Sequence, residues 1–437
     1  MALKVGVARE IITPELGGLF AGYGSKKPSD RVNDDLTVTA IALESGDTKV
    51  LFMSATVCLI SNDLCDKLRE KCGAAAGVPA KNVIVTAVHT HTGPVLSELD
   101  DDYKDDGVPL PVGSADKYCR EIFAPKFILA AGNAVKDMKP VTMGVAAGKS
   151  LVGINRRRLL RNGKVILAQN PWGFYDPEMT VISFKGEDGK PVANIIHCTA
   201  HNTAAGIVTE VSRDWCGVMI DRLEFQSGAV TAFLNGCAGD VSPRTPDGGS
   251  TSDMKQMREI GAVAGIDAVK IYNDIREYRD ADVTTVTDEI KIPFAPVKPL
   301  ELAKEQLAAI ENSDARFDDG KRKKLRAVIE MYETNDFGPD DFSFEQTLVR
   351  LGPVVFIPFP FEPLSEISLR LRFYSKLGHT LAVGYANGSN SYLPSQDQIC
   401  RGGYEIDMFK WAMARQLPDD TDTKIINANL DLMEKLL

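Results

Sequence analysis

Short apolar runs that alternate with amphipathic segments are the feature that most constrains the fold of this chain. The apolar runs are rich in aliphatic and β-branched residues and are bounded by turn-forming residues, which predicts buried strands. The clearest of these runs are 38–45, 49–60, 82–88, 141–148, 180–185, 192–200, 229–236, 347–351, 353–359 and 379–387. The segments with helical spacing are 61–72, 115–135, 213–225, 253–272 and 422–437. The pattern predicts an α/β fold in which mixed sheets are flanked by helices.

Residues 298–336 differ in composition from the rest of the chain. Their middle part, 300–332, is rich in Ala, Glu, Lys and Leu, which favour helices, and a polar tripeptide at 318–320 interrupts it. We therefore expect a pair of helices that is broken near this tripeptide. The pair would be a small insertion in a single domain that spans 1–437.

Charge and hydropathy exclude several classes of protein. Fifty Lys and Arg residues stand against sixty Asp and Glu residues, which gives a net charge of −10. This balance argues against nucleic-acid binding, because that binding needs cations that displace condensed counterions. No apolar run reaches the roughly 18 residues that a transmembrane helix needs, and the N-terminal segment lacks the apolar core of a signal peptide. We therefore expect a cytoplasmic protein that acts on a small molecule, without stable membrane insertion and without a nucleic-acid partner.

Four of the five histidines fall in two tight clusters, each at the end of a predicted buried strand. The first cluster holds His89 and His91, and the second holds His197 and His201. Residues two or four positions apart share one face of a strand, so each pair is expected to point to the same side at a sheet edge. Imidazole is a common metal ligand, and a catalytic zinc needs about three protein ligands. The clusters therefore indicate a metal site, with hydrogen-bonded structural histidines as the alternative.

Ser242 lies just after the predicted strand 229–236, in a tip of small residues that allows close approach of the backbone. Such a serine is a nucleophile, a substrate ligand or a turn residue whose neighbour Asp240 caps the loop. The sequence contains no GxSxG pattern of the kind that forms a nucleophile elbow. Taken alone, this segment therefore favours the turn residue.

Glu362 and two tyrosines occupy polar segments that follow apolar strands. Glu362 stands at a Pro-rich turn that leads into a predicted helix. A carboxylate at this position is either a cap near the helix N-terminus or a site residue, and we favour neither. Tyr392 and Tyr404 lie in a glycine-rich loop, where tyrosines are usually packing residues.

Together these segments resemble the neutral (non-lysosomal) ceramidase family, and the resemblance runs through most of the chain in order. HTHTGP at 89–94 is similar to the family's H-T-H-S-G-P almost letter for letter. The other similar segments are AREIITPELGGLFAGYG at 8–24, GDVSP at 239–243, FPFEP at 359–363, and YANGSNSYLP with GGYE between 385 and 405. The resemblance implies the α/β catalytic domain of that family and hydrolysis of an amide bond.

The resemblance also implies a zinc ion, which in that family is held by two histidines, a glutamate and a tyrosine. It places these ligands at His89, His201, Glu362 and Tyr392. His201 aligns better than His197, because Gly206 and Asp214 downstream keep the family's spacing. His197 stays an alternative for the second histidine.

Four catalytic residues follow from the same resemblance: Ser242, His91, Arg156 and Tyr404. Ser242 matches a serine that the family needs for amide cleavage, and His91 would face the substrate. Arg156 and Tyr404 match residues that line the scissile amide, where they are suitable donors to a developing oxyanion. His91 or Tyr404 would deliver a proton to the leaving nitrogen. Whether metal-activated water or Ser242 attacks the amide carbon stays open.

Several residues depart from the family pattern. Phe361 replaces the glycine before the glutamate, and Thr56 stands where relatives often have aspartate. The acidic run 101–106, together with Arg157 and Arg158, adds charge near the expected site. The secreted ceramidases carry a C-terminal sandwich domain, which we do not expect here. The added charge indicates a substrate that is smaller and more polar than ceramide.

Three functions remain open on this evidence. We favour a zinc-dependent hydrolase that cleaves an amide (N-acyl) bond. The second is a metal-dependent enzyme that acts on a carbohydrate or a hydroxy acid, by ester or lactone hydrolysis or by lyase chemistry. The third is a metal-free binding protein of the same fold, which the retained ligand set argues against.

Overall fold

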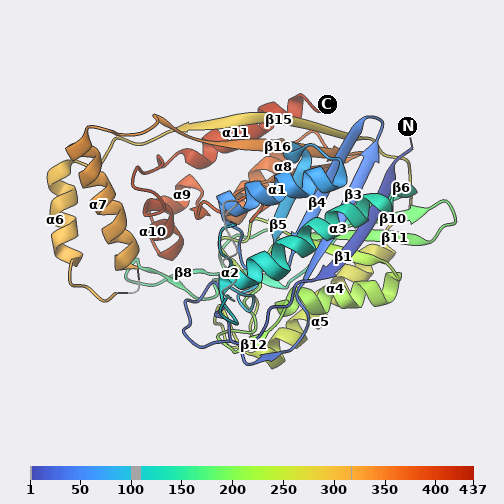
Figure 1. Ribbon diagram of the computed structural model, residues 1–437, viewed down its shortest axis with the longest axis horizontal. Coiled ribbons are helices and arrows are strands. Elements are labelled where there is room, and N and C mark those ends of the chain that lie inside the picture. The colour runs from blue at the N-terminus through green and yellow to red at the C-terminus, as the bar shows by residue number, and fades with distance from the viewer. Residues whose placement is uncertain (1, 100–109, 316) are drawn as a thin grey trace.

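The computed structural model describes residues 2–99, 110–315 and 317–437, and Figure 1 shows the arrangement of its elements. The acidic run 101–106 lies outside the described residues. The α/β fold with mixed sheets and flanking helices is confirmed. Among the helices in the described ranges, none is both long enough and apolar enough to cross a bilayer.

A large sheet of eight strands forms the centre of the fold. Its strands, in spatial order, are β13 (Val230–Asn235), β11 (Pro191–Cys198), β10 (Glu178–Gly186), β6 (Lys139–Lys149), β1 (Lys4–Ile11), β3 (Thr37–Ser45), β4 (Thr48–Ala55) and β5 (Val83–Ala87). The pairs β11–β13 and β4–β5 are parallel, and the other neighbours are antiparallel. The hairpin expected between the runs 38–45 and 49–60 is β3–β4, which turns at Gly46 and Asp47.

A second sheet of four strands lies against the large sheet. Its strands, in spatial order, are β15 (Val283–Pro293), β16 (Asp341–Leu351), β17 (Val354–Pro358) and β19 (His379–Val383). The pair β17–β19 is parallel, so the chain leaves both strands at the same end. This end carries the segments that lead to Glu362 and to the late tyrosines.

The two faces of the large sheet belong to different hydrophobic cores. Along β3, Val38, Ala40 and Ala42 pack toward helices, whereas Ile41 and Leu43 pack toward the small sheet. This alternation is the period of two that a strand buried on both faces requires. The helices over the large sheet are α1 (Asn62–Ala76), α3 (Ala124–Lys136), α4 (Asp214–Ser227) and α5 (Met254–Asn273).

The outer face of the small sheet is covered by α8 (Ser365–Tyr374) and α11 (Thr421–Glu434). Leu348 and Val355 of the sheet pack there with Ile367 of α8 and with Ile425 and Ile426 of α11. The fold is therefore a stack of helices, large sheet, small sheet and helices. Strands that are buried on both faces, such as β4 and β17, are nearly continuously apolar, as this layered arrangement requires.

Short elements complete the structure and shape the loops at the strand ends. The short strand pairs are β2 (Arg31–Val32) with β12 (Glu210–Val211), β7 (Gly153–Asn155) with β14 (Val241–Pro243), β8 (Arg157–Leu159) with β9 (Val165–Leu167), and β18 (Glu362–Pro363) with β20 (Tyr392–Leu393). The short helices are η1 (Ala80–Asn82), α2 (Ala115–Tyr118), η2 (Cys119–Phe123), α9 (Gln396–Ile399) and α10 (Tyr404–Lys410). The expected helix at 115–135 is thus interrupted by one π-helical turn, η2.

Two helices lie where the insertion was expected: α6 (Leu300–Ile310) and α7 (Asp318–Thr334). Figure 1 shows them at one end of the molecule, beside α10 and far from both termini. The break lies directly before the tripeptide at 318–320, close to where it was expected, because α6 ends at Ile310 and α7 begins at Asp318. Asp318 and Asp319 form the first turn of α7, where carboxylates interact favourably with the helix dipole.

Phe361, which stands where the ceramidase pattern has glycine, is a core residue here. Its side chain is buried, and its ring lies 6.0 Å from the Phe342 ring and 5.8 Å from the Phe344 ring. The larger residue therefore fills space between the strand that bears Glu362 and the small sheet.

We predict that Phe361→Ala lowers the free energy of unfolding by about 3–5 kcal/mol, since it removes a buried aromatic ring and leaves a cavity. Urea denaturation followed by circular dichroism measures the change. Phe373→Ala is the matched control, because Phe373 is 80% exposed, and it should stay within about 0.5 kcal/mol of the wild type. Equal effects of the two substitutions would contradict the packing described here.

Candidate metal centre

The candidate site forms where the carboxyl ends of strands from both sheets meet. The two edge strands of the large sheet, β5 and β13, contact one another, which the natural twist of a large sheet allows. The Val88 carbonyl, just after β5, accepts hydrogen bonds from the Asn202 and Asn235 side chains at 2.5 and 3.1 Å. The Gly384 amide, just after β19, donates to the Asn235 carbonyl at 3.0 Å. These bonds join the loops that follow β5, β11, β13 and β19.

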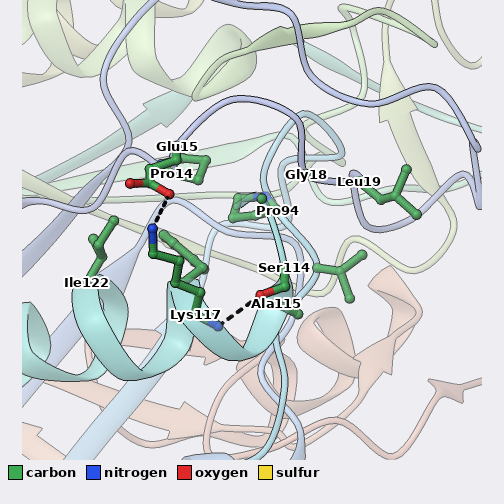
Figure 2. Close-up of a pocket in the computed structure, with 12 residues that line it drawn as sticks. Pro14, Glu15, Gly18, Leu19, Pro94, Ser114, Ala115, Lys117 and Ile122 are labelled. Atoms are coloured by element: carbon green, nitrogen blue, oxygen red, sulfur yellow. Dashed lines mark hydrogen bonds and ion pairs between the residues drawn. The ribbon is translucent and has the colours of Figure 1, made fainter. Parts of the chain in front are cut away.

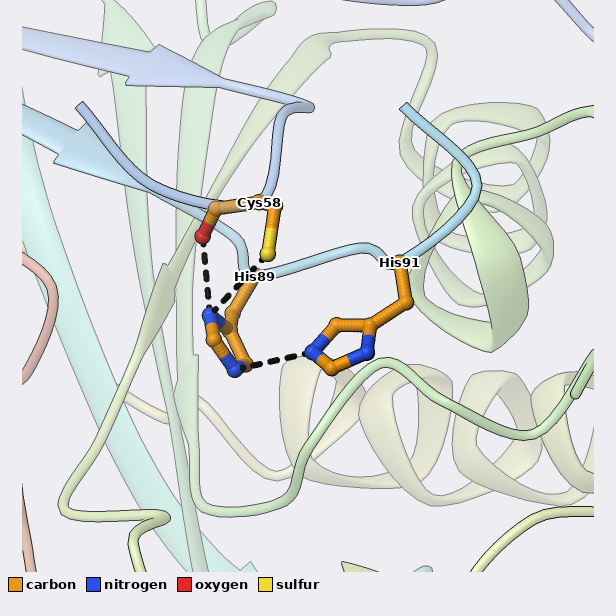
Figure 3. A group of neighbouring side chains, drawn as sticks. All are labelled: Cys58, His89 and His91. Atoms are coloured by element: carbon orange, nitrogen blue, oxygen red, sulfur yellow. Dashed lines mark hydrogen bonds between the residues drawn. The ribbon is translucent and has the colours of Figure 1, made fainter. Parts of the chain in front are cut away.

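His89 lies two residues beyond the end of β5 and has a left-handed backbone, with φ of 70°. Its amide donates to the Val57 carbonyl at 2.9 Å, and its Nδ1 lies 2.8 Å from the Cys58 carbonyl oxygen (Figure 3). A carbonyl can only accept, so Nδ1 carries the proton and Nε2 carries the lone pair. Nε2 faces His91 Nε2 at 3.1 Å and Glu362 Oε2 at 3.5 Å.

His201 is fixed in the same way by the loop after β13. Its Nδ1 donates to the Ala238 carbonyl at 2.7 Å, which leaves the lone pair on Nε2. That Nε2 lies 3.4 Å from Glu362 Oε2. Asp214 holds the loop after His201, because its carboxylate accepts from the amides of Ala204 and Ala205 at 3.1 and 2.9 Å.

Glu362 enters the site from β18 through a close backbone contact. The Gly239 amide donates to the Pro363 carbonyl at 2.8 Å, and a Cβ on Gly239 would lie 2.6 Å from the Glu362 carbonyl oxygen. Only glycine fits at this distance. The close backbone approach expected for the small residues near 236–239 is thus present. It determines how far the Glu362 side chain reaches into the site.

His89, His201 and Glu362 form a buried group whose ligand atoms all lie within 4.8 Å of one another. The exposed fractions of the three residues are 2%, 1% and 9%. His201 Nε2 and Glu362 Oε2 have no hydrogen-bond partner among the residues that the structure describes. Two buried acceptor atoms that face one another without a proton between them are costly unless a cation joins them.

The charge states of these groups suit a cation. Burial lowers the pKa of both imidazoles, and nearby Arg156 lowers it further, to about 3 for His201. Burial alone would raise the pKa of the Glu362 carboxyl, but interactions with His89, His201 and Arg156 outweigh burial and lower it to about 2. At neutral pH the group therefore offers two neutral nitrogen lone pairs and one carboxylate, which is a donor set found at catalytic zinc sites.

A second group that could hold a metal consists of Cys58, His89 and His91 (Figure 3). It fits a cation less well, because His89 Nδ1, the nitrogen nearest to the Cys58 thiol, already donates to the Cys58 carbonyl. Burial also raises the pKa of the Cys58 thiol well above its usual range, which disfavours the thiolate that binds metals.

Tyr392 and Arg156 lie beside the buried group. Tyr392 pairs with Glu362 across β18–β20, and its hydroxyl accepts a hydrogen bond from Arg156 Nη2 at 2.9 Å. Glu405 fixes the guanidinium by accepting from Arg156 Nε at 2.9 Å and from Arg157 Nη1 at 2.6 Å. The Tyr404 ring lies 5.6 Å from the Tyr392 ring, so the structure brings Arg156, Tyr392 and Tyr404 together.

Ser242 is fully buried in β14, opposite Ile154 of β7. Its Oγ has no hydrogen-bond partner in the described part of the chain. The carbonyl of Val241, the residue before it, accepts from the His201 amide at 3.0 Å. Ser242 therefore stands next to the backbone that positions His201.

His91 packs against the segment near the N-terminus that carries the AGYG motif. The Tyr23 ring meets the His91 ring edge-on at 4.5 Å. Gly22 has φ of 93°, and a Cβ there would lie 2.4 Å from His91 Nδ1. The motif at 21–24 therefore fixes the position of His91 from a distant part of the sequence.

The structure separates His197 from the site. His197 Nε2 bonds the Ala382 carbonyl at 2.9 Å, between the two sheets, whereas His201 joins His89 and Glu362. The expectation that each histidine pair shares a strand face is wrong, because β5 ends at Ala87 and β11 ends at Cys198. His89, His91 and His201 all lie in loops.

Sequence reasoning missed Tyr385 and Glu405. The Tyr385 ring stacks on the His89 ring at 4.1 Å, and its hydroxyl is buried with no hydrogen-bond partner among the described residues. The YANG motif was visible in the sequence, but only the left-handed backbone of Tyr385, with φ of 55°, turns the ring toward His89. Glu405, in GGYE, is fully buried between two arginines, which no local pattern indicates.

A separate cavity of about 230 Å³ lies near Pro94, beyond the histidine loop (Figure 2). Lys117 closes one edge through an ion pair of 2.8 Å with Glu15. Its described lining residues include none of the candidate metal centre, so we do not place the substrate there.

Comparisons with solved structures find this fold in ceramidases. The neutral ceramidase from Pseudomonas aeruginosa superposes with a TM-score of 0.75 and 19% identity over 100% of this chain and 74% of that chain. A ceramidase complexed with C2 gives a TM-score of 0.74 and 17% identity over 100% of this chain and 75% of that chain. No protein-family model and no curated protein matches the sequence. The chain therefore has a ceramidase-like fold.

Proposed function

We propose that this protein is a zinc-dependent hydrolase that cleaves the amide bond of an N-acyl compound more polar than ceramide. The observation that carries the proposal is the convergence of His89 Nε2 and His201 Nε2 on Glu362 Oε2. The fold shared with ceramidases supports the reaction class.

The residues that would hold the ion are His89, His201, Glu362 and Tyr392. The backbone carbonyls of Cys58 and Ala238 accept from Nδ1 of both imidazoles, so both would bind the ion through Nε2, as metal-bound histidines commonly do. Tyr392 is the fourth candidate, because it pairs with Glu362 and its hydroxyl faces the Arg156 guanidinium. When bound, such an ion polarises a carbonyl and makes water acidic.

Arg156 would stabilise the negative charge that develops on the amide oxygen. Glu405 and Tyr392 hold its guanidinium in one orientation, so no reorganisation is needed during the reaction. The Ser242 hydroxyl would donate to the same oxygen or attack the carbonyl carbon. The donor role is supported by the absence of a hydrogen-bond partner of Ser242 Oγ among the described residues. The nucleophile role would also require a base beside the hydroxyl.

Proton delivery to the leaving nitrogen needs a donor near the amide. His91 and Tyr404 are the candidates from the sequence, and Tyr385 is a third candidate. Its ring stacks on the His89 ring and its hydroxyl is buried, which places it beside the centre. Burial raises the pKa of this hydroxyl well above its usual range, so it is a weaker acid than an ordinary tyrosine.

Elemental analysis of His201→Ala and His197→Ala tests the metal site. We predict about one zinc per chain in the wild type and in His197→Ala, and none in His201→Ala, because only His201 faces Glu362. Glu362→Gln preserves the shape of the side chain, so it should lose the metal without loss of the fold. Equal zinc in all variants would contradict the assignment.

Tyr392→Phe and Tyr385→Phe form a matched pair, since both remove one buried hydroxyl beside the centre. If Tyr392 is the fourth ligand, its substitution weakens zinc affinity by about 10–100-fold in competition with a chelator, and Tyr385→Phe leaves the affinity unchanged. A loss of zinc affinity in Tyr385→Phe, with no loss in Tyr392→Phe, would assign the fourth ligand to Tyr385.

Ser242→Ala should retain full metal content and lower kcat on a fluorescent N-acyl amide by about 100-fold or more, the usual loss of one oxyanion donor. Ser368→Ala is the control, because Ser368 is equally buried but bonds Asp176 in another part of the core. An unchanged kcat in Ser242→Ala would remove the serine from the mechanism.

A further inference from the structure

Helix α7, the hairpin β8–β9, helix α10 and the loop that precedes α10 line a cavity of about 520 Å³. Figure 1 shows α7, α10 and β8 at the same end of the molecule. Tyr404 forms part of the cavity wall, and its ring packs at 5.6 Å on the ring of Tyr392. The cavity therefore lies next to Tyr392, one of the candidate residues of the metal centre.

The charges that line this cavity are mainly positive. Lys164, Lys321 and Arg401 contribute three cations, and Asp407 is the one acid among the lining residues in the described ranges. The whole chain carries a net charge of −10. The excess of positive charge in the cavity is therefore opposite in sign to the net charge of the whole chain.

Neighbouring carboxylates neutralise these cations only in part. Lys321 lies 3.3 Å from Asp318, and Arg401 lies 3.9 Å from Asp397, a long separation for an ion pair. Lys164, near the tip of the β8–β9 hairpin, forms no ion pair with any residue that the structure describes. Two of the three cations thus lack a close acidic neighbour.

The other walls of the cavity are aromatic. Phe317, Tyr404 and Trp411 line it, and the Phe317 and Tyr404 rings lie 5.8 Å apart. The ammonium groups of Lys298 and Lys321 lie 5.4 and 5.8 Å from the centre of the Trp411 ring. Apolar walls with a few convergent charged groups are the usual composition of a small-molecule site.

We propose that this cavity binds the anionic part of the substrate, so that the enzyme acts on N-acyl compounds whose other half is acidic. The inference rests on the proposed amide hydrolysis and names its substrate class. An uncharged lipid amide such as ceramide offers these cations no anionic partner, whereas a carboxylate, phosphate or sulfate would pair with them.

Binding of two fluorescent probes tests the cavity without reference to catalysis. The anionic probe is 8-anilinonaphthalene-1-sulfonate, and the uncharged probe of similar shape is N-phenyl-1-naphthylamine. The variant Lys164→Glu/Lys321→Glu reverses two cavity charges. Lys323→Glu is the control, because Lys323 lies on the same helix, is exposed and does not line the cavity.

We expect the double charge reversal to lower the affinity for the sulfonate probe by about tenfold or more, because the new carboxylates would repel the sulfonate. The control should bind it as the wild type does, and the uncharged probe should bind all three proteins equally. Equal sulfonate affinity in all three proteins would overturn the proposal, as would equal weakening by the control.

Hydrolysis of N-dodecanoyl-glutamate and of an uncharged N-dodecanoyl amide separates this inference from the proposed function. In the wild type, kcat/KM should be higher for the acidic amide than for the uncharged amide. Loss of this preference in the double variant would support both the anion site and the proposed amide hydrolysis. Cleavage of both amides with no charge dependence would overturn the inference alone. Charge-dependent probe binding without cleavage of either amide would keep the anion site and overturn the amide hydrolase.

Discussion

Two hydrogen bonds from histidine Nδ1 atoms to backbone carbonyls determine what this site can do. His89 donates to Cys58 and His201 donates to Ala238, so both Nε2 lone pairs face the Glu362 carboxylate. With the opposite tautomers, the same side chains would be ordinary hydrogen-bonded core histidines. The carbonyls come from the loops after β4 and β13, and therefore the chemistry of the centre depends on how those strands end.

The segments that carry the candidate metal ligands follow four strands, β5, β11, β17 and β19. The edge strands β5 and β13 of the large sheet contact one another, and the small sheet adds Glu362 and the tyrosines from the ends of β17 and β19. Gly239 and Gly384 permit backbone contacts that any Cβ would prevent, at 2.6 Å from the Glu362 carbonyl oxygen and at 2.7 Å from the Gly236 carbonyl oxygen. The site is thus assembled by contacts between residues far apart in the sequence.

Local patterns predicted the elements well and their ends poorly. The β3–β4 hairpin and helix α1 with its Ser61 cap follow from periodicity and capping, which are local effects. Strand alternation placed His197 and His201 together, but β11 ends between them, and the loop that follows is held by Asp214. Which histidine enters the site was therefore decided by tertiary hydrogen bonds. The family resemblance selected His201, because it compares whole motifs rather than local periodicity.

The remaining site residues show the same limit. The role of Tyr385 depends on a positive φ, and that of Glu405 depends on two arginines about 250 positions away. The most direct test of the metal centre is anomalous diffraction at the zinc absorption edge from crystals of the zinc-loaded protein. We expect one strong peak within bonding distance of His89 Nε2, His201 Nε2 and a Glu362 carboxylate oxygen. A peak beside Cys58 and His91 instead, or no peak among these three ligands, would contradict it.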